Sequence, residues 1–326
     1  MDRVKEFTIL TIIFIACIII IEIIFSPQYI TMENIASSKP NFISILTANV
    51  GNLNLGCRNV LNKLCYKDVE ERISINIKAL SPDIIALQEI LAPWQCTKKE
   101  KNKNKVCYET QVVPQARRLV GDNYTIICNS RNQFECVAVK LDTGKILGCK
   151  PGSICDSART APEIQGCDNG FTVSAATVRL KTGGIFDIVN FHPQSTDAHC
   201  RAQMISTAFE GTKTSPPLIQ ENKVILLGDL NLDPWRDTDE SAITWMKFID
   251  NGWKGKEFVY HSGVIEYNPP YPTSFSLFRK KTVDIVVSNF SKGTCTVLGE
   301  STNTTRLDGG KGTDHRAVFG ILTISP

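Results

Sequence analysis

The chain has 326 residues, of which 42% are hydrophobic and 8% aromatic, so its composition excludes a disordered protein and supports a sizeable core. Its formal net charge of +3 is compatible with a phosphate-bearing substrate, but it is too small to indicate nucleic-acid binding without further evidence. The length fits either two domains or one catalytic domain behind a leader.

The first predicted element is a membrane segment. Residues 7–25 read FTILTIIFIACIIIIEIIF, an apolar run about as long as a bilayer core requires and interrupted only by Glu22. A run without a polar face is not typical of a helix in a soluble domain. Arg3 and Lys5 precede it, so we expect the N-terminus to stay cytoplasmic and the rest to be exported.

This segment predicts a chain in three parts: a signal anchor over residues 1–25, a polar linker over 26–40 and a catalytic domain over 41–326. An uncleaved anchor would hold the catalytic domain at the membrane, on its extracytoplasmic side. The small residues from Ala36 to Ser38 leave cleavage by a signal peptidase as the alternative, which would give a secreted protein.

Short strands dominate the predicted catalytic domain. A first helix is expected over 68–80, where Val69, Ile73 and Ile77 share one face, and a second near 200–210. The predicted strands cover residues 42–50, 83–90, 125–128, 135–141, 171–180, 184–191, 224–231, 282–289 and 315–324. Such runs, separated by Gly, Pro and Asn, indicate two packed sheets with helices outside them.

Two segments between these elements have open interpretations. The charged stretch KKEKNKNK, residues 98–105, is predicted to be a solvated hairpin tip, with a substrate-binding finger as the alternative. The cysteine-rich stretch 142–170 is predicted to be a disulfide-stapled surface excursion, with a substrate-shaping loop as the alternative.

The cysteines indicate an oxidising compartment. One of the twelve lies in the predicted anchor, and the other eleven are dispersed from Cys57 to Cys295 without a CxxC pair, which disfavours a structural zinc site. An odd number leaves a free thiol or a bond to another chain. The near pairs are Cys57 with Cys65, Cys96 with Cys107, and Cys149 with Cys155 or Cys167.

Polar side chains stand where several predicted strands end. The residues at these positions are Asn49, Glu89, His192, Asp229 and Asn231, with Asp314 and His315 just before the last strand. Phosphodiester hydrolysis needs carboxylates to hold a hard cation, a base to activate water and donors for the charge that develops at phosphorus. These residue types meet those needs, and no GxSxG motif points to serine catalysis.

The segments TANV, QE, NFHP, GDLN, VDIVVSN and TDHRAVFG follow one another in residues 44–324. In order and spacing the chain resembles the endonuclease/exonuclease/phosphatase superfamily, whose fold is that of deoxyribonuclease I. The resemblance implies an α/β, four-layer sandwich in which two mixed β-sheets lie face to face between helices, with a metal site at one edge.

The resemblance also implies roles for the metal ligands. Glu89 corresponds to the main ligand, with Asn49 beside it and Asp314 completing the site. Because all three supply hard oxygen atoms, Mg²⁺ is the expected ion and Mn²⁺ the alternative.

The remaining roles concern the water and the phosphate. Asp229 would orient or deprotonate the attacking water, and Asn231 would hold a phosphate oxygen. His315 would lie at the scissile phosphate with its tautomer fixed by Asp284, and His192 would be a second imidazole on the phosphate. Glu135 matches the glutamate that pairs with this histidine in deoxyribonuclease I, although a surface charge at the start of a strand is the alternative.

The chain departs from the family pattern at two positions. Gly51 stands where relatives of exonuclease III often carry an aspartate, and Ile285 stands where the deoxyribonuclease I and inositol phosphatase motifs have an arginine. Signatures of inositol polyphosphate phosphatases are not visible.

Three functions compete at this point. An extracytoplasmic endonuclease acting on nucleic acid is favoured by His192 with Glu135 and by the basic loop 98–105. A sphingomyelinase-type phospholipid phosphodiesterase is the alternative, with Asn268–Thr273, Phe275 and Phe278 as a candidate lipid-facing loop. A catalytically idle binding module on the same fold is the third.

Overall fold

The computed structural model describes residues 42–51, 63–96, 101, 103–108, 113–168, 170–262, 272–275, 280–299, 304–310 and 312–324. The predicted anchor and linker lie outside these residues. No helix among the described residues is long and apolar enough to cross a membrane.

Thirteen strands of the described residues form one continuous hydrogen-bonded sheet, which divides into two halves at β6 (Ile154–Thr160). The first half-sheet contains β1 (Phe42–Asn49), β2 (Ile84–Gln88), β3 (Tyr124–Asn129), β4 (Cys136–Lys140), β14 (Ser291–Val297) and β15 (Val318–Ile324). The second half-sheet contains β5 (Gly144–Ile146), β7 (Thr172–Leu180), β8 (Ile185–His192), β9 (Val224–Asp229), β10 (Val259–Tyr260) and β13 (Asp284–Ser288). A separate ribbon pairs β11 (Ser274–Phe275) with β12 (Lys280–Lys281).

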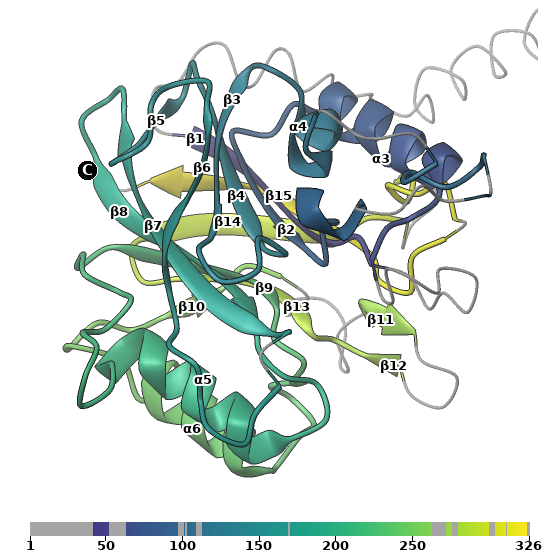
Figure 1. The fold of residues 1–326 in the computed structure, drawn as a ribbon. Helices are drawn as coiled ribbons and strands as arrows, with labels where there is room; N and C mark the ends of the chain where they lie inside the picture. Colours follow the sequence, from purple (N-terminus) through teal and green to yellow (C-terminus); the bar gives the residue numbers. More distant parts are fainter. Residues whose placement is uncertain are drawn as a thin grey trace, which may run out of the picture. The chain divides into compact units, whose positions relative to one another are not determined.

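Helices cover the outer face of each half-sheet, which gives four layers (Figure 1). On the first half-sheet lie α3 (Lys67–Leu80) and α4 (Gln115–Val120), and on the second lie α5 (Ala198–Glu210) and α6 (Glu240–Phe248). A short 3-10 helix, η1 (Pro93–Cys96), follows β2. The predicted helices 68–80 and 200–210 correspond to α3 and α5.

Three apolar clusters hold these layers together. Ile45 of β1 and Ile225 of β9 share the cluster between the two half-sheets, while Ile73 of α3 and Trp245 of α6 belong to the two clusters beneath the helices. Both faces of each half-sheet are therefore buried, which explains why strands such as β9 read as continuous apolar runs rather than alternating ones.

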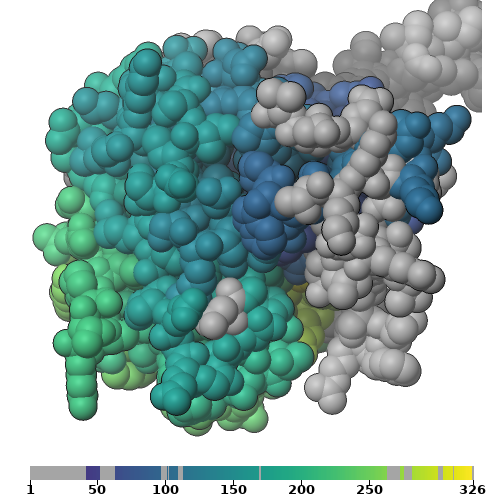
Figure 2. Space-filling view, in the orientation of Figure 1, coloured from purple at the N-terminus to yellow at the C-terminus, as the bar shows by residue number. Residues whose placement is uncertain are grey.

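The cysteine-rich segment 142–170 is not the surface excursion that the sequence predicted. Its strand β6 pairs with β3 on one side and β7 on the other, so it joins the two half-sheets. Teal atoms, the colour of the chain from β3 to β8 that includes this segment, lie over the left and centre of the view in Figure 2. The expectation of two separate sheets is corrected accordingly, because β6 makes their hydrogen bonding continuous.

Disulfides close loops in both half-sheets. The predicted pairs Cys96–Cys107 and Cys149–Cys155 are present, whereas Cys167 pairs with Cys200 of α5 instead of Cys149. Cys128 and Cys136 form a bond that the sequence did not predict, across neighbouring positions of β3 and β4. Cys65 is also disulfide-bonded, while the predicted partner Cys57 lies outside the described residues. Cys295 is a free thiol, one of the two outcomes that the odd count allowed.

Candidate active site

Strand register brings the first two site residues to one edge of the first half-sheet. β1 and β2 run parallel with Asn49 opposite Gln88, so Asn49 and the next residue after β2, Glu89, lie side by side. The Asn49 Nδ2 group lies 3.3 Å from Oε1 of Glu89. The predicted pairing of these two residues at a strand edge is confirmed.

The second half-sheet supplies His192 and Asp229 in the same way. β8 and β9 run parallel with Phe191 opposite Gly228, which places the two residues that follow at one edge. A Cβ on Gly228 would lie 2.2 Å from the Phe191 carbonyl oxygen, and its φ is +128°. Only glycine therefore allows β9 to approach β8 this closely just before Asp229.

Two site residues have left-handed backbone conformations within two residues of the end of their strands. Glu89 has φ of 57° and Asn231 has φ of 50°. This conformation is common for asparagine but unfavourable for glutamate, and such strain persists where the surrounding structure enforces it, often at functional sites. The turn after β2 thus aims the Glu89 carboxylate back over the edge of the sheet.

Asp229 lies at the centre of the site. Its Oδ2 accepts a hydrogen bond from Asn49 Nδ2 at 2.9 Å and lies 3.6 Å from Nε2 of His315 and 4.0 Å from Nε2 of His192. Its Oδ1 accepts the backbone N–H of Asn231 at 2.8 Å. One carboxylate oxygen therefore faces three polar groups that come from distant parts of the chain.

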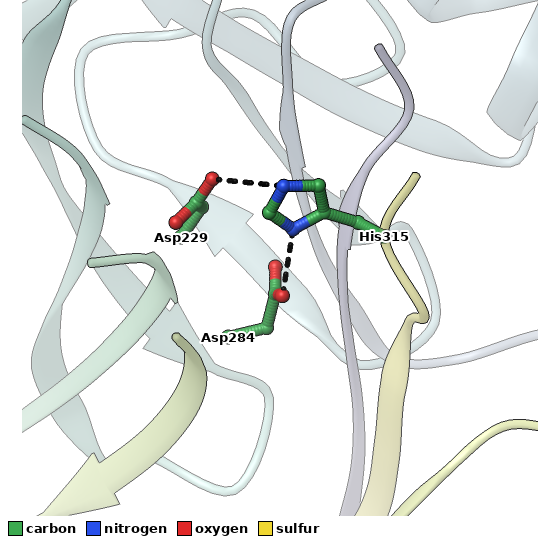
Figure 3. Close-up of side chains that lie close together, drawn as sticks. All are labelled: Asp229, Asp284 and His315. Atoms are coloured by element: carbon green, nitrogen blue, oxygen red, sulfur yellow. Dashed lines mark hydrogen bonds and ion pairs between the residues drawn. The ribbon is translucent and has the colours of Figure 1, made fainter. Parts of the chain in front are cut away.

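His315 lies between two carboxylates (Figure 3). Its Nδ1 is 2.9 Å from Oδ2 of Asp284, and Asp284 stands opposite Asp229 in the antiparallel pair of β13 and β9. Burial by itself would lower the pKa of His315, but the charges of Asp284 and Asp229 outweigh it and raise this pKa well above its ordinary value. A ring protonated on both nitrogens can donate from Nε2 while Nδ1 stays bound to Asp284.

His192 is held by a second carboxylate pair. Its Nδ1 lies 2.9 Å from Oε1 of Glu135, and its Nε2 lies 3.5 Å from Oε1 of Glu89. Burial would lower the pKa of His192, but hydrogen bonds and charges from Glu135 and Glu89 raise it to about 9. Glu135 is fully buried, so its alternative interpretation as a surface charge is wrong.

The ring of His192 is further fixed by its neighbours. Phe171 packs edge-on against it, with ring centroids 5.1 Å apart. Asn129 Nδ2 donates to the second oxygen of Glu135 at 2.6 Å, which holds that carboxylate toward the histidine. Nε2 of His192 makes no hydrogen bond with the described residues and faces the site.

The donor atoms fit a hard divalent cation beside Glu89. Its Oε1 is occupied by contacts with Asn49 and His192, whereas its Oε2 accepts no hydrogen bond within the described part of the chain. Burial raises the pKa of Asp314, and the negative charges of Glu89 and Asp229 raise it further, so the three carboxylates lie within electrostatic reach of one another. A dication would relieve this repulsion.

A second group of residues could also hold an ion. Ligand atoms of Asp229, Asp284 and His315 all lie within 4.8 Å of one another. We favour the position at Glu89, because the 2.9 Å contact between His315 and Asp284 occupies Nδ1 of the ring and one oxygen of the carboxylate, whereas Oε2 of Glu89 is open.

The side-chain amide of Asn231 is anchored to the backbone beside the site. Its Nδ2 donates to the Pro193 carbonyl oxygen at 2.9 Å, so one of its two amide protons is occupied by the backbone. The other amide proton remains for a phosphate oxygen.

Several residues of the site were missed by sequence reasoning. Thr273 accepts the backbone N–H of Asp284 through its hydroxyl at 2.9 Å, and Asn129 supports Glu135. Lys63 is buried, and its ammonium interacts with the charges of Glu89 and Glu135. No local motif marks these three residues, because each reaches the site only through tertiary contacts.

Comparisons with known proteins agree with this geometry. No protein-family model matches the chain, and no curated protein matches it. Among solved structures, an endonuclease/exonuclease/phosphatase family protein from Bacteroides thetaiotaomicron aligns with a TM-score of 0.54 at 14% identity, over 88% of this chain and 100% of its own.

Two further structures align over a similar extent. Truncated TDP2 from Caenorhabditis elegans has a TM-score of 0.53 at 13% identity, over 86% of this chain and 98% of its own. ANGEL2, described as a 2',3'-cyclic phosphatase and solved with adenosine-2',3'-vanadate, has a TM-score of 0.53 at 12% identity, over 87% and 96%. The described chain therefore has the deoxyribonuclease I-like fold of endonuclease/exonuclease/phosphatase family proteins.

Proposed function

We propose that the protein is a divalent-metal-dependent phosphodiester hydrolase that acts as an extracytoplasmic endonuclease. One observation supports the proposal above all: the side chains of Asn49, His192 and His315 converge on Oδ2 of Asp229. The three come from different parts of the chain, and the Glu89 carboxylate lies beside them. These groups supply a base, two proton-bearing imidazoles and a cation ligand within one site.

In this proposal Asp229 is the base, the two histidines are proton donors and Glu89 is the metal ligand. Asp229, held by Asn49 and Asn231, accepts a proton from the attacking water. His192 and His315 donate from Nε2 to phosphoryl oxygens, since their Nδ1 atoms are bound to Glu135 and Asp284. Mg²⁺ held by Glu89, with Asn49 and Asp314 nearby, would supply positive charge at the phosphoryl group and the leaving oxygen.

An idle binding module is disfavoured by the same network. Glu135, Asp229 and Asp284 are at most 1% exposed, and burying carboxylates is costly unless partners compensate. Replacing buried ionic groups with apolar ones of similar size is often neutral or stabilising, so stability alone does not account for keeping such a network.

Nucleic acid is the proposed substrate. The pairing of His192 with Glu135 resembles that of deoxyribonuclease I. An exposed aromatic ring packs on the residue before Glu135: Trp94, which is 55% exposed, lies on Phe134 with ring centroids 5.8 Å apart. Exposed aromatic rings beside a phosphate site are typical platforms for stacking bases. Of the loop proposed to face lipid, residues 268–271, Phe278 and the side chain of Phe275 lie outside the description, whereas Thr273 is buried and bonded to Asp284.

Disulfides support the proposed compartment. Bonds such as Cys167–Cys200 persist in oxidising environments and are rare in the cytosol, which agrees with a catalytic domain exported behind residues 7–25. The proposal includes anchoring of the protein at a membrane through those residues.

The substrate is tested by incubating the full-length protein with plasmid DNA, RNA and sphingomyelin vesicles, with magnesium, with manganese and with chelator. We expect metal-dependent nicking of DNA whose binding weakens steeply as salt rises, because phosphate contacts release counterions. Release of choline phosphate without nuclease activity would replace the endonuclease by the sphingomyelinase-type enzyme. Inactivity on every substrate would reject both.

A further inference from the structure

Lys63 places an ammonium group against an aromatic ring. Its side chain is 6% exposed, and Nζ stands 3.8 Å above the ring of Phe134. Within the described part of the chain this ammonium makes no hydrogen bond or ion pair, and Nζ is not one of the fully buried atoms without a partner. Its N–H groups can therefore reach an oxygen atom of a ligand.

The position of Lys63 points to the active site. Phe134 directly precedes Glu135, and the Phe134 carbonyl accepts the N–H of Ile90, directly after Glu89. Burial lowers the pKa of Lys63, and the carboxylates of Glu89 and Glu135 act against this. The ammonium therefore lies within electrostatic range of the two carboxylates that flank His192, and no ion pair joins it to either within the described residues.

The charges of the site explain why a further cation is useful there. Carboxylates outnumber imidazoles, and a phosphodiester would add another negative charge. The carboxylates are Glu89, Glu135, Asp229, Asp284 and Asp314, and the imidazoles are His192 and His315. A divalent ion at Glu89 offsets part of this excess, and an ammonium on the Glu135 side would offset more where the phosphoryl group enters.

We propose that Lys63 is a further catalytic residue, whose ammonium donates a hydrogen bond to a non-bridging oxygen of the substrate's phosphoryl group. Phe134 holds the ammonium in place through its ring face, and the carboxylates of Glu89 and Glu135 keep it charged. This role rests on the proposed function. Because Lys63 would bind the phosphoryl group and not the metal, its replacement should cause a loss of activity that added magnesium cannot restore.

The test uses Lys63→Met, which keeps the length of the side chain and removes its charge. We expect kcat/KM for bis(4-nitrophenyl) phosphate at saturating magnesium to fall about 100-fold, as for the loss of one donor to a developing oxyanion. Calorimetry should show about 10-fold weaker binding of inorganic phosphate, the loss of one charge-assisted bond, with unchanged magnesium affinity.

A matched control is available in Lys105. It is also buried, at 5% exposure, and its Nζ stands 3.4 Å above the ring of Tyr66. Lys105→Met should match Lys63→Met in any change of thermal midpoint but retain turnover and phosphate affinity. If both variants lose activity equally, Lys63 is a structural residue and the proposal is wrong.

A second variant keeps the proposal testable if Lys63→Met does not fold. Phe134→Leu keeps an apolar side chain but removes the ring face, so phosphate affinity should fall about 3- to 10-fold, in line with the loss of a cation–π contact. Wild-type phosphate affinity in Phe134→Leu or in folded Lys63→Met would overturn the role of Lys63. An inactive wild type would instead overturn the proposed function.

Discussion

Replacing Glu135 by glutamine should move the pH dependence of hydrolysis to lower pH. The substitution preserves the size of the side chain but removes the charge that lies 2.9 Å from Nδ1 of His192. Glu135 is one of two groups that raise the pKa of His192 from 6.5 to about 9. Without it, burial pulls that pKa back toward or below the ordinary value.

The size of the effect follows from the protonated fraction of His192. At pH 8 a group of pKa about 9 is about 90% protonated, whereas at the ordinary value the fraction is about 3%, so kcat should fall about 30-fold at pH 8 and little at pH 6. The assay is a pH profile of magnesium-dependent turnover of an aryl phosphodiester from pH 5.5 to 9.5.

A surface pair provides the control for this prediction. Glu240 lies 3.1 Å from Nδ1 of His199, and both side chains are more than half exposed. Glu240→Gln removes the same kind of charge from the same kind of partner and should leave the profile unchanged. If folded Glu135→Gln kept the wild-type profile, the assignment of His192 as a proton donor held by Glu135 would be refuted.

Four further predictions concern the base, the ion, the metal-free protein and the disulfides. Asp229→Asn should reduce kcat by about 10²- to 10⁴-fold, the range for loss of a general base, and retention of more than a tenth of the activity would exclude that role. Magnesium at about 100 times its Kd should raise the free energy of unfolding of the wild type by about 2.7 kcal/mol, and that of Glu89→Gln by far less, as measured by urea unfolding. Equal stabilisation of the two proteins would show that the ion does not bind at Glu89. In chelator, protonated His192 should contribute fully to the free energy of unfolding below pH 6.5, and this contribution should be lost as pH rises through about 9, because the folded pKa of His192 is raised. The expected loss in the free energy of unfolding between pH 6 and 9.5 is about 3 kcal/mol. A free energy of unfolding that does not change over this range would contradict the prediction. Replacing both Cys167 and Cys200, which are 33 positions apart, with alanine should lower the free energy of unfolding by about 4 kcal/mol. The same change at Cys149 and Cys155, 6 positions apart, should lower it by about 2 kcal/mol. The reverse ranking would show that loop entropy does not set the contributions of these disulfides.

Much of the fold could be predicted because the relevant signals are local. The apolar run before Asn49 and the run before Asp229 are strands buried on both faces, and a polar residue directly after such a run marks the strand end. Register in the parallel pairs then brings these ends together, so the ordered motifs were enough to predict which side chains converge.

The features that escaped prediction depend on contacts between distant segments. The pairing of β6 with both β3 and β7 is set by tertiary packing, and its sequence, ICDSART, lacks the apolar alternation of a strand. The Cys128–Cys136 bond follows from the register of a hairpin, and Cys167 reaches Cys200 because α5 packs on the second half-sheet. Lys63 stands outside every motif, so only its position over Phe134 indicates a role.

The most direct measurement of whether these side chains form one phosphodiesterase centre is turnover of bis(4-nitrophenyl) phosphate by the full-length wild type and by Asp229→Asn. We predict release of nitrophenol by the wild type with magnesium, its abolition by chelator, its return when magnesium is added back, and loss of at least 100-fold in the variant. Equal rates for the two proteins, or a wild-type rate indifferent to chelator, would contradict the proposed site.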